Sequence, residues 1–72
     1  MVLLGLSYKN LTQIPIISND VTELYLSGNQ ITKIENLSSS LQILNLDGNK
    51  ITKIENLPKN LQTLCLGSNQ II

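Results

Sequence analysis

Aliphatic residues recur along this chain at intervals that change within each stretch of twenty residues. Leu24 and Leu26 alternate with polar neighbours, and this period of two predicts a short strand with one face directed inward. Ile31, Ile34 and Leu37 follow at intervals of three, which suits an extended or 3₁₀-like arm that meets the core once per turn. The pattern therefore predicts a strand followed by a return arm, with few or no true helices.

The same order of apolar and polar positions repeats every twenty residues. Residues 21–40 and 41–60 are identical at eleven positions, among them the heptapeptide ITKIENL. A partial copy covers residues 61–72, and residues 1–20 place six aliphatic residues on the same columns: Met1, Leu4, Leu6, Leu11, Ile14 and Ile17. We name the four units coils 1 to 4 in chain order and expect them to form a single domain over residues 1–72.

Each coil opens with a related motif. Coils 2 to 4 begin with VTELYLSGNQI, LQILNLDGNKI and LQTLCLGSNQI, and coil 1 begins with the more degenerate MVLLGLSYKNL. These motifs resemble the leucine-rich repeat family, whose consensus begins L-x-x-L-x-L-x-x-N-x-L. The joint LPKNLQTLCL is similar to the short repeats of some bacterial effectors, and the abundance of isoleucine, asparagine and lysine resembles that of uncharacterised repeat proteins of large DNA viruses. The resemblance implies an α/β solenoid with a curved parallel sheet of about four strands and extended or 3₁₀ arms on the convex side.

Neighbouring coils are expected to cover one another, because one coil of a repeat protein cannot bury its own aliphatic residues. Copies with the same outline stack without voids, which explains why a chain of 72 residues repeats ITKIENL. Gly28 and Gly48 lie where the strand turns into the arm, and we expect positive φ angles there. Pro15 and Pro58 fall in the arms, where an extended path suits them.

An asparagine follows the strand at the same position in three coils, as Asn29, Asn49 and Asn69. Backbone groups that leave the ladder at this turn still face inward and need partners. An amide side chain offers both donors and an acceptor, and the resemblance implies a structural ladder of asparagines that bridges successive coils. Coil 1 has Lys9 at this position and Asn10 one residue later, so we expect an atypical, partly solvated turn there.

The outward positions of the strands and of the residues just after them define a surface that we call the strand face. It comprises Leu3, Gly5, Ser7, Glu23, Tyr25, Ser27, Ile43, Asn45, Asp47, Thr63, Cys65 and Gly67. The resemblance implies that this surface is concave and binds a protein. Tyrosine is enriched among interface anchors, so Tyr25 and Ile43 form the expected apolar anchor. The predicted partner-binding residues are Glu23, Tyr25, Ile43, Asn45, Asp47 and Cys65, and the alternative is that they are ordinary surface residues.

Composition argues against several other classes of function. The chain has one cysteine, Cys65, and no histidine, so we expect no disulfide, no metal site, no cofactor and no catalytic nucleophile–base pair. Five lysines balance five acidic residues and two tyrosines are the only aromatics, which argues against nucleic-acid binding. No apolar run is long enough to span a bilayer and no signal peptide is evident, so we expect a cytoplasmic protein that is not an enzyme.

The two ends of the repeat array lack obvious polar caps. The chain stops partway along an arm at Ile71 and Ile72, and the aliphatic residues of coil 4 have no coil beyond them. Two interpretations stay open. The chain is a fragment or minimal array that binds a protein partner through the strand face, or it is a structural element that self-associates through its uncapped ends.

Overall fold

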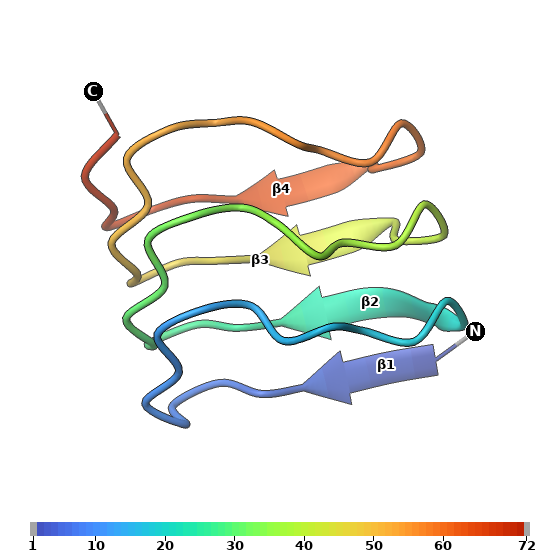
Figure 1. Cartoon of the computed structure of the whole chain (residues 1–72), viewed down its shortest axis with the longest axis horizontal. Coiled ribbons are helices and arrows are strands. Elements are labelled where there is room, and N and C mark those ends of the chain that lie inside the picture. The colour runs from blue at the N-terminus through green and yellow to red at the C-terminus, as the bar shows by residue number, and fades with distance from the viewer. Residues whose placement is uncertain (1, 72) are drawn as a thin grey trace.

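A computed structural model describes residues 2–71, and Met1 and Ile72 lie outside the described residues. The chain forms four strands: β1 (Val2–Gly5), β2 (Val21–Tyr25), β3 (Ile43–Asn45) and β4 (Thr63–Cys65). They make one parallel sheet in the order β1-β2-β3-β4, with β1 at one end of the stack and β4 at the other (Figure 1). The predicted solenoid of four stacked coils is thereby confirmed.

Strand pairing follows the period of the sequence. Leu24 pairs with Leu44 and Leu44 with Leu64, so each step across the sheet is a step of twenty residues. Between β1 and β2 the register shifts once, next to Val2, and then keeps the same offset. Because side chains alternate along a strand, this register aligns the inward leucines in one file and the outward residues in another.

The return arms run back over the sheet without helical turns (Figure 1). The spacing of three allowed either an extended or a 3₁₀-like arm. No α- or 3₁₀-helix occurs in residues 2–71, so the arms are extended. Backbone bonds tie each arm to the next, as Lys50 N donates to Ile31 O at 2.8 Å and Gln70 N to Ile51 O at 3.0 Å. These bonds supply the partners that an arm without internal helical bonds requires.

The core lies between the sheet and the arms and contains branched aliphatic residues from successive coils. Its buried members are Ile14, Ile17, Val21, Leu24, Leu26, Ile31, Ile34, Leu41, Leu44, Leu46 and Ile51. Partly buried leucines from coils 1, 2 and 4 pack against them. The periodic columns therefore converge on one interior, as the pattern predicted.

Two aliphatic residues expected to point into this interior are exposed. Ile54 is 55% exposed and Leu57 is 37% exposed, although Ile34, the counterpart of Ile54 in coil 2, is fully buried. The arm of coil 3 covers Ile34, whereas the described part of coil 4 ends at residue 71, before its own arm reaches Ile54. The expectation that the aliphatic residues of each arm meet the core was therefore wrong for Ile54 and Leu57, because burial depends on the following arm.

The asparagines of the turn serve two coils each. Asn49 Nδ2 donates to the carbonyls of Leu26 at 2.9 Å and Leu46 at 3.0 Å, and its Oδ1 accepts from Ile31 N at 3.0 Å. Asn29 and Asn69 repeat this arrangement toward coils 1 and 3. Each asparagine thus bonds to backbone groups of its own coil and of the preceding coil. The ladder therefore runs in one direction, from each coil back to the one before it.

The direction of the ladder explains how coil 1 accommodates Lys9. The turn of coil 1 uses Asn29 of coil 2, whose Oδ1 accepts from both Lys9 N and Leu11 N at 3.0 Å. In addition, Asn10 has a φ of 58°, which no residue at the equivalent position of the other coils shares. The turn of coil 1 is therefore atypical in backbone shape, yet its inward groups have partners.

The residue before each ladder position adopts positive φ in all four coils. Gly28 and Gly48 both have φ of 68°, while Tyr8 and Ser68 reach 57° and 54° at the two ends of the stack. The Tyr8 ring covers Gly28 so closely that a Cβ there would lie 2.2 Å from a ring carbon. Glycine at Gly28 thus relieves backbone strain and also makes room for an aromatic side chain.

A second pair of structural asparagines lies in the arms, at Asn36 and Asn56. Both have positive φ, of 60° and 55°, and each Nδ2 donates to the carbonyl of an isoleucine in the preceding coil. The acceptors are Ile14 O at 2.8 Å and Ile34 O at 3.1 Å. The signal for this second ladder was present in the sequence, as the asparagine shared by both copies of ITKIENL.

Candidate functional site

The strand face gathers all six predicted partner-binding residues on one side of the sheet. The register sets Glu23 beside Ile43 and Tyr25 beside Asn45, with Cys65 beside Asn45 on β4 and Asp47 just after β3. Each of the six is half-buried, because it stands on the sheet with neighbours on adjacent strands. The fold therefore brings the predicted residues together on a continuous surface.

Glu23 and Tyr25 form a hydrogen-bonded pair on this surface. They lie two residues apart on β2, so their side chains leave the same face, and the Tyr25 hydroxyl donates to Glu23 Oε1 at 2.8 Å. This hydrogen bond raises the pKa of the Tyr25 hydroxyl above its ordinary 10.0, with desolvation and the negative charge of Glu23 adding to the shift. The pair fixes one aromatic ring and one carboxylate in a defined position.

Asp47 and Asn45 hold the turn at the end of the strand face. Asp47 Oδ1 accepts from Gly67 N at 2.7 Å, and Asn45 Oδ1 accepts from Asp47 N at 3.0 Å. Both side chains therefore have structural roles that the sequence analysis did not identify. One oxygen of the Asp47 carboxylate is consequently engaged by the adjacent coil.

Leu3 and Gly5 extend the strand face over β1. Leu3 is 61% exposed and pairs with Glu23, while Gly5 pairs with Tyr25. A Cβ built on Gly5 would meet no atom within 4 Å, so the surface beside Tyr25 is open. The alternating pattern of residues 2–6 had predicted that both residues lie on the strand face, but neither was among the predicted partner-binding residues.

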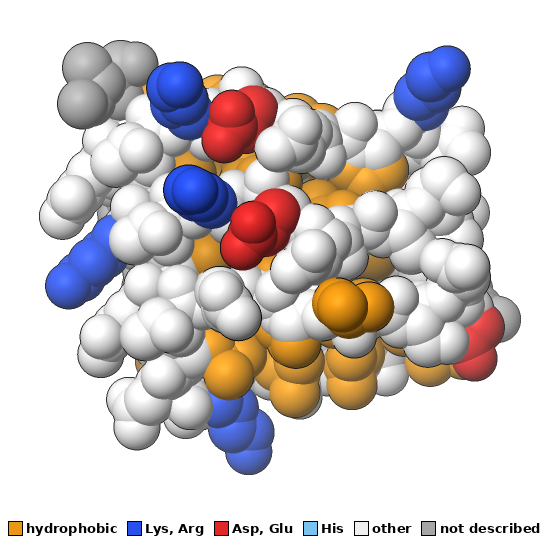
Figure 2. All heavy atoms as spheres, in the orientation of Figure 1, with side chains coloured by type: hydrophobic (Ala, Val, Ile, Leu, Met, Phe, Trp, Pro, Cys, Tyr) orange, Lys and Arg blue, Asp and Glu red, His pale blue; other side chains and the backbone are white. Residues whose placement is uncertain are grey.

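Charge is distributed unequally between the strand face and the rest of the chain. Among strand-face positions the charged residues are Glu23 and Asp47, and the five lysines all fall in turns and arms. The arms of coils 2 and 3 carry the pairs Lys33/Glu35 and Lys53/Glu55, and Figure 2 shows basic and acidic side chains adjacent in two rows. The strand face is therefore acidic although the chain as a whole is neutral.

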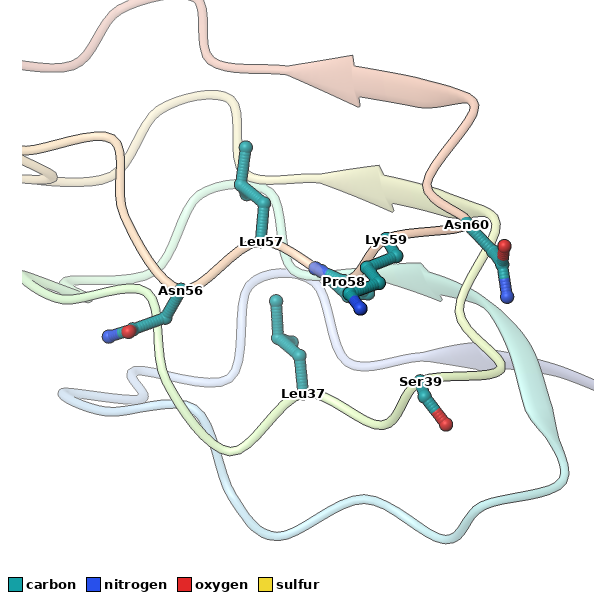
Figure 3. A pocket seen from close by; sticks show the side chains of 7 residues that line it. All are labelled: Leu37, Ser39, Asn56, Leu57, Pro58, Lys59 and Asn60. Atoms are coloured by element: carbon teal, nitrogen blue, oxygen red, sulfur yellow. The ribbon is translucent and has the colours of Figure 1, made fainter.

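A hollow lies on the arms of coils 2 and 3. This hollow of about 610 Å³ is open to solvent, and Leu37 and Leu57 line it from successive arms (Figure 3). Its lining residues are Leu37, Ser39, Asn56, Leu57, Pro58, Lys59 and Asn60. Leu57, which is 37% exposed, leaves apolar surface in this hollow.

In the part of the chain that the structure describes, no three Cys, Asp or Glu side chains lie close enough together to hold a metal ion. Over residues 2–71 there is likewise no helix with the length and apolar character to cross a bilayer.

Comparison with known proteins gives one match. The family model described as leucine-rich repeats, in two copies, matches residues 19–59. That span covers coils 2 and 3, which carry the two full copies of ITKIENL. No curated protein and no solved structure matches the chain at a significant level.

Proposed function

The chain belongs to the leucine-rich repeat family, and we propose that it is a non-catalytic module that binds a protein partner through the strand face. Domains of this family generally mediate protein–protein interaction and are typically not enzymes. The observation that carries the proposal is the adjacency of Tyr25, Ile43 and Glu23 across β2 and β3. An aromatic and an aliphatic side chain with a polar rim is the usual composition of an interface anchor.

The structure of Tyr25 also favours binding. A ring already held by Glu23 loses little rotamer freedom when it is covered by a partner, so less of the interaction energy is spent on ordering. Ile43 is half-buried beside Glu23 on the neighbouring strand and offers apolar area that a partner can complete. Asn45 and Cys65 continue the surface toward β4.

Photocrosslinking tests this function. A photoreactive amino acid at Ile43 is expected to capture a partner, whereas the same group at Thr32, exposed on the arm of coil 2, is expected to capture none. The captured protein is then identified, purified and titrated against variants. Tyr25→Ala should weaken binding about tenfold or more, in line with the loss of an interface anchor, while Thr32→Ala should not. A partner whose affinity changes only with the arm variant would overturn the proposal.

A second candidate function, self-association through the end of coil 4, has its own supporting observation. Ile54, Leu57 and Ile71 are 55%, 37% and 41% exposed at that end, where the equivalent positions of inner coils are covered. Simple head-to-tail stacking is disfavoured, because coil 1 carries Lys9 at the position from which Asn69 bonds to the preceding coil. Light scattering over a dilution series tests this function, and a monomer at every concentration would exclude it.

The variant Ile54→Asp separates the two functions. A charge at this exposed position should abolish any association through the end of coil 4 and leave binding through the strand face unchanged. A charge at Ile71 serves the same purpose, and Ile72, the other apolar residue at this end of the sequence, lies outside the described residues.

A further inference from the structure

The carboxylate of Glu23 has one oxygen in use and one available. Oε1 accepts the hydrogen bond from Tyr25, and within residues 2–71 the Glu23 carboxylate accepts no other. The side chain is half-buried, so part of its hydration has already been given up. A fixed, partly desolvated carboxylate attracts a cation more strongly than a mobile carboxylate in bulk water.

Space for an incoming side chain lies next to this carboxylate, over β1. Gly5 pairs with Tyr25, and no atom lies within 4 Å of the point where its Cβ would be. The space is bordered along the same strand by Leu3, which is 61% exposed. By contrast, a Cβ at Gly67, the last position of the strand face, would already lie 3.3 Å from Asp47 Oδ1.

Among residues 2–71, no cationic side chain lies on the strand face. The five lysines lie at positions 9, 33, 50, 53 and 59, in turns and arms, and the chain has no histidine. Glu23 and Asp47 therefore leave the strand face with uncompensated negative charge. A partner with acidic groups would be repelled, whereas one with a basic group would be attracted to this surface.

We propose that the strand face recognises a lysine or arginine side chain of its protein partner, seated over Gly5 with its charged head on Glu23. The aliphatic stem packs on Leu3, as the stems of long basic side chains do on apolar surfaces. The ring of Tyr25 contributes a cation–π contact to the same group. This inference rests on the proposed function, because it names the chemistry of the partner at the same surface.

Two short probe peptides test the inference by NMR. Both are blocked at their ends and consist of alternating glycine and serine, one with a central lysine and the other with a central norleucine. The lysine peptide at millimolar concentration should shift the backbone amide signals of Gly5 and Glu23 in a saturable manner. The norleucine peptide lacks the charge, and we expect its affinity to be about tenfold lower.

A matched pair of variants tests whether the lysine peptide binds to the carboxylate on the strand face or to a carboxylate elsewhere on the chain. Glu23→Gln should lower the affinity for the lysine peptide about three- to fivefold, whereas Glu55→Gln, the same change on an arm, should not alter it. Unchanged amide signals of Leu44 and Ile31 would show that both variants keep the fold. Added salt should weaken binding of the lysine peptide and leave the norleucine peptide unaffected.

The outcomes distinguish this inference from the function on which it rests. Equal shifts from both peptides, lost in Tyr25→Ala, would overturn the cation site and keep the strand face as a binding surface. Strongest shifts near Glu55, or none at Gly5, would also overturn the cation site. Failure of the proposed function is a different result, namely a captured partner that binds outside the strand face.

Discussion

The two copies of ITKIENL have the same sequence and different surroundings. Ile31 and Ile34 of the first copy are fully buried, and so is Ile51 of the second, whereas Ile54 is 55% exposed. The backbone is conserved as well, since Asn36 and Asn56 share positive φ and the same kind of bond to the preceding coil. The comparison shows that a coil acquires its backbone path from its own sequence and its burial from the next coil.

The largest expected effect contrasts truncation of the two equivalent isoleucines. Ile34→Ala removes a fully buried side chain and should reduce the free energy of unfolding by about 2–5 kcal/mol. Ile54→Ala removes a side chain that is already more than half exposed, so its cost should stay below about 1 kcal/mol. Urea unfolding followed by circular dichroism measures both, and equal losses would contradict the burial difference described above.

The ladder asparagines give the next contrast. Asn49→Ala leaves Ile31 N without its acceptor inside the stack and removes one of the two amide donors to Leu26 O, at a cost of about 2–4 kcal/mol. Asn69→Ala removes equivalent bonds to Ile51 N and Leu46 O, but it lies at a half-buried turn where water replaces part of the loss. Its cost should be roughly half as large. The same unfolding assay applies, and a larger effect at Asn69 would break the comparison.

Substitutions at the positive-φ turn should change the free energy of unfolding by smaller amounts, with opposite signs at Gly48 and Ser68. Gly48→Ala forces a side chain into a φ of 68° and places its Cβ 3.4 Å from Gly28 N, so we expect a loss of about 1–2 kcal/mol. Ser68 adopts a φ of 54° at the end of the stack without being glycine. Ser68→Gly should therefore be neutral or stabilising by up to about 1 kcal/mol. Thermal unfolding reports both, and destabilisation by Ser68→Gly would show that the hydroxyl matters more than the backbone strain.

The smallest expected effect on stability comes from the hydrogen bond between Glu23 and Tyr25 on coil 2. The equivalent residues of coil 3, Ile43 and Asn45, are not ionisable. The pKa of Tyr25 is raised in the folded state, so the folded chain holds this proton more tightly than the unfolded one. The bond therefore adds stability below pH 10.0, and the contribution is lost as the pH rises through the raised pKa.

Absorbance of tyrosinate measures this shift directly. The variant Tyr8→Phe keeps an aromatic ring over Gly28 and leaves Tyr25 as the sole tyrosine of the chain. In that background, Glu23→Gln should lower the titration midpoint of Tyr25 toward 10.0, because the charged acceptor is lost. A midpoint that does not move would mean that the hydrogen bond is absent in solution.

Much of the fold was predictable because it depends on local periodicity. Alternation at Leu24 and Leu26 defines a strand wherever it occurs, and a period of twenty residues aligns each strand with its equivalent. The partner-binding residues could be placed on one face for the same reason. Their hydrogen bonds could not be predicted. Asp47 accepts a hydrogen bond from Gly67 N of the next coil, and the Tyr25 hydroxyl donates to Glu23 on its own strand rather than to Asn45 on the next.

The sequence by itself determined the period, the inward columns and the positions of the asparagines, because each is a property of one repeat. The tertiary structure alone decided which copies are covered, since Ile34 and Ile54 differ only in what lies beyond them. It also decided that each asparagine serves the preceding coil, which makes the two ends of the stack unlike. The physical reason is that burial and hydrogen-bond partners in a solenoid come from the neighbouring coil.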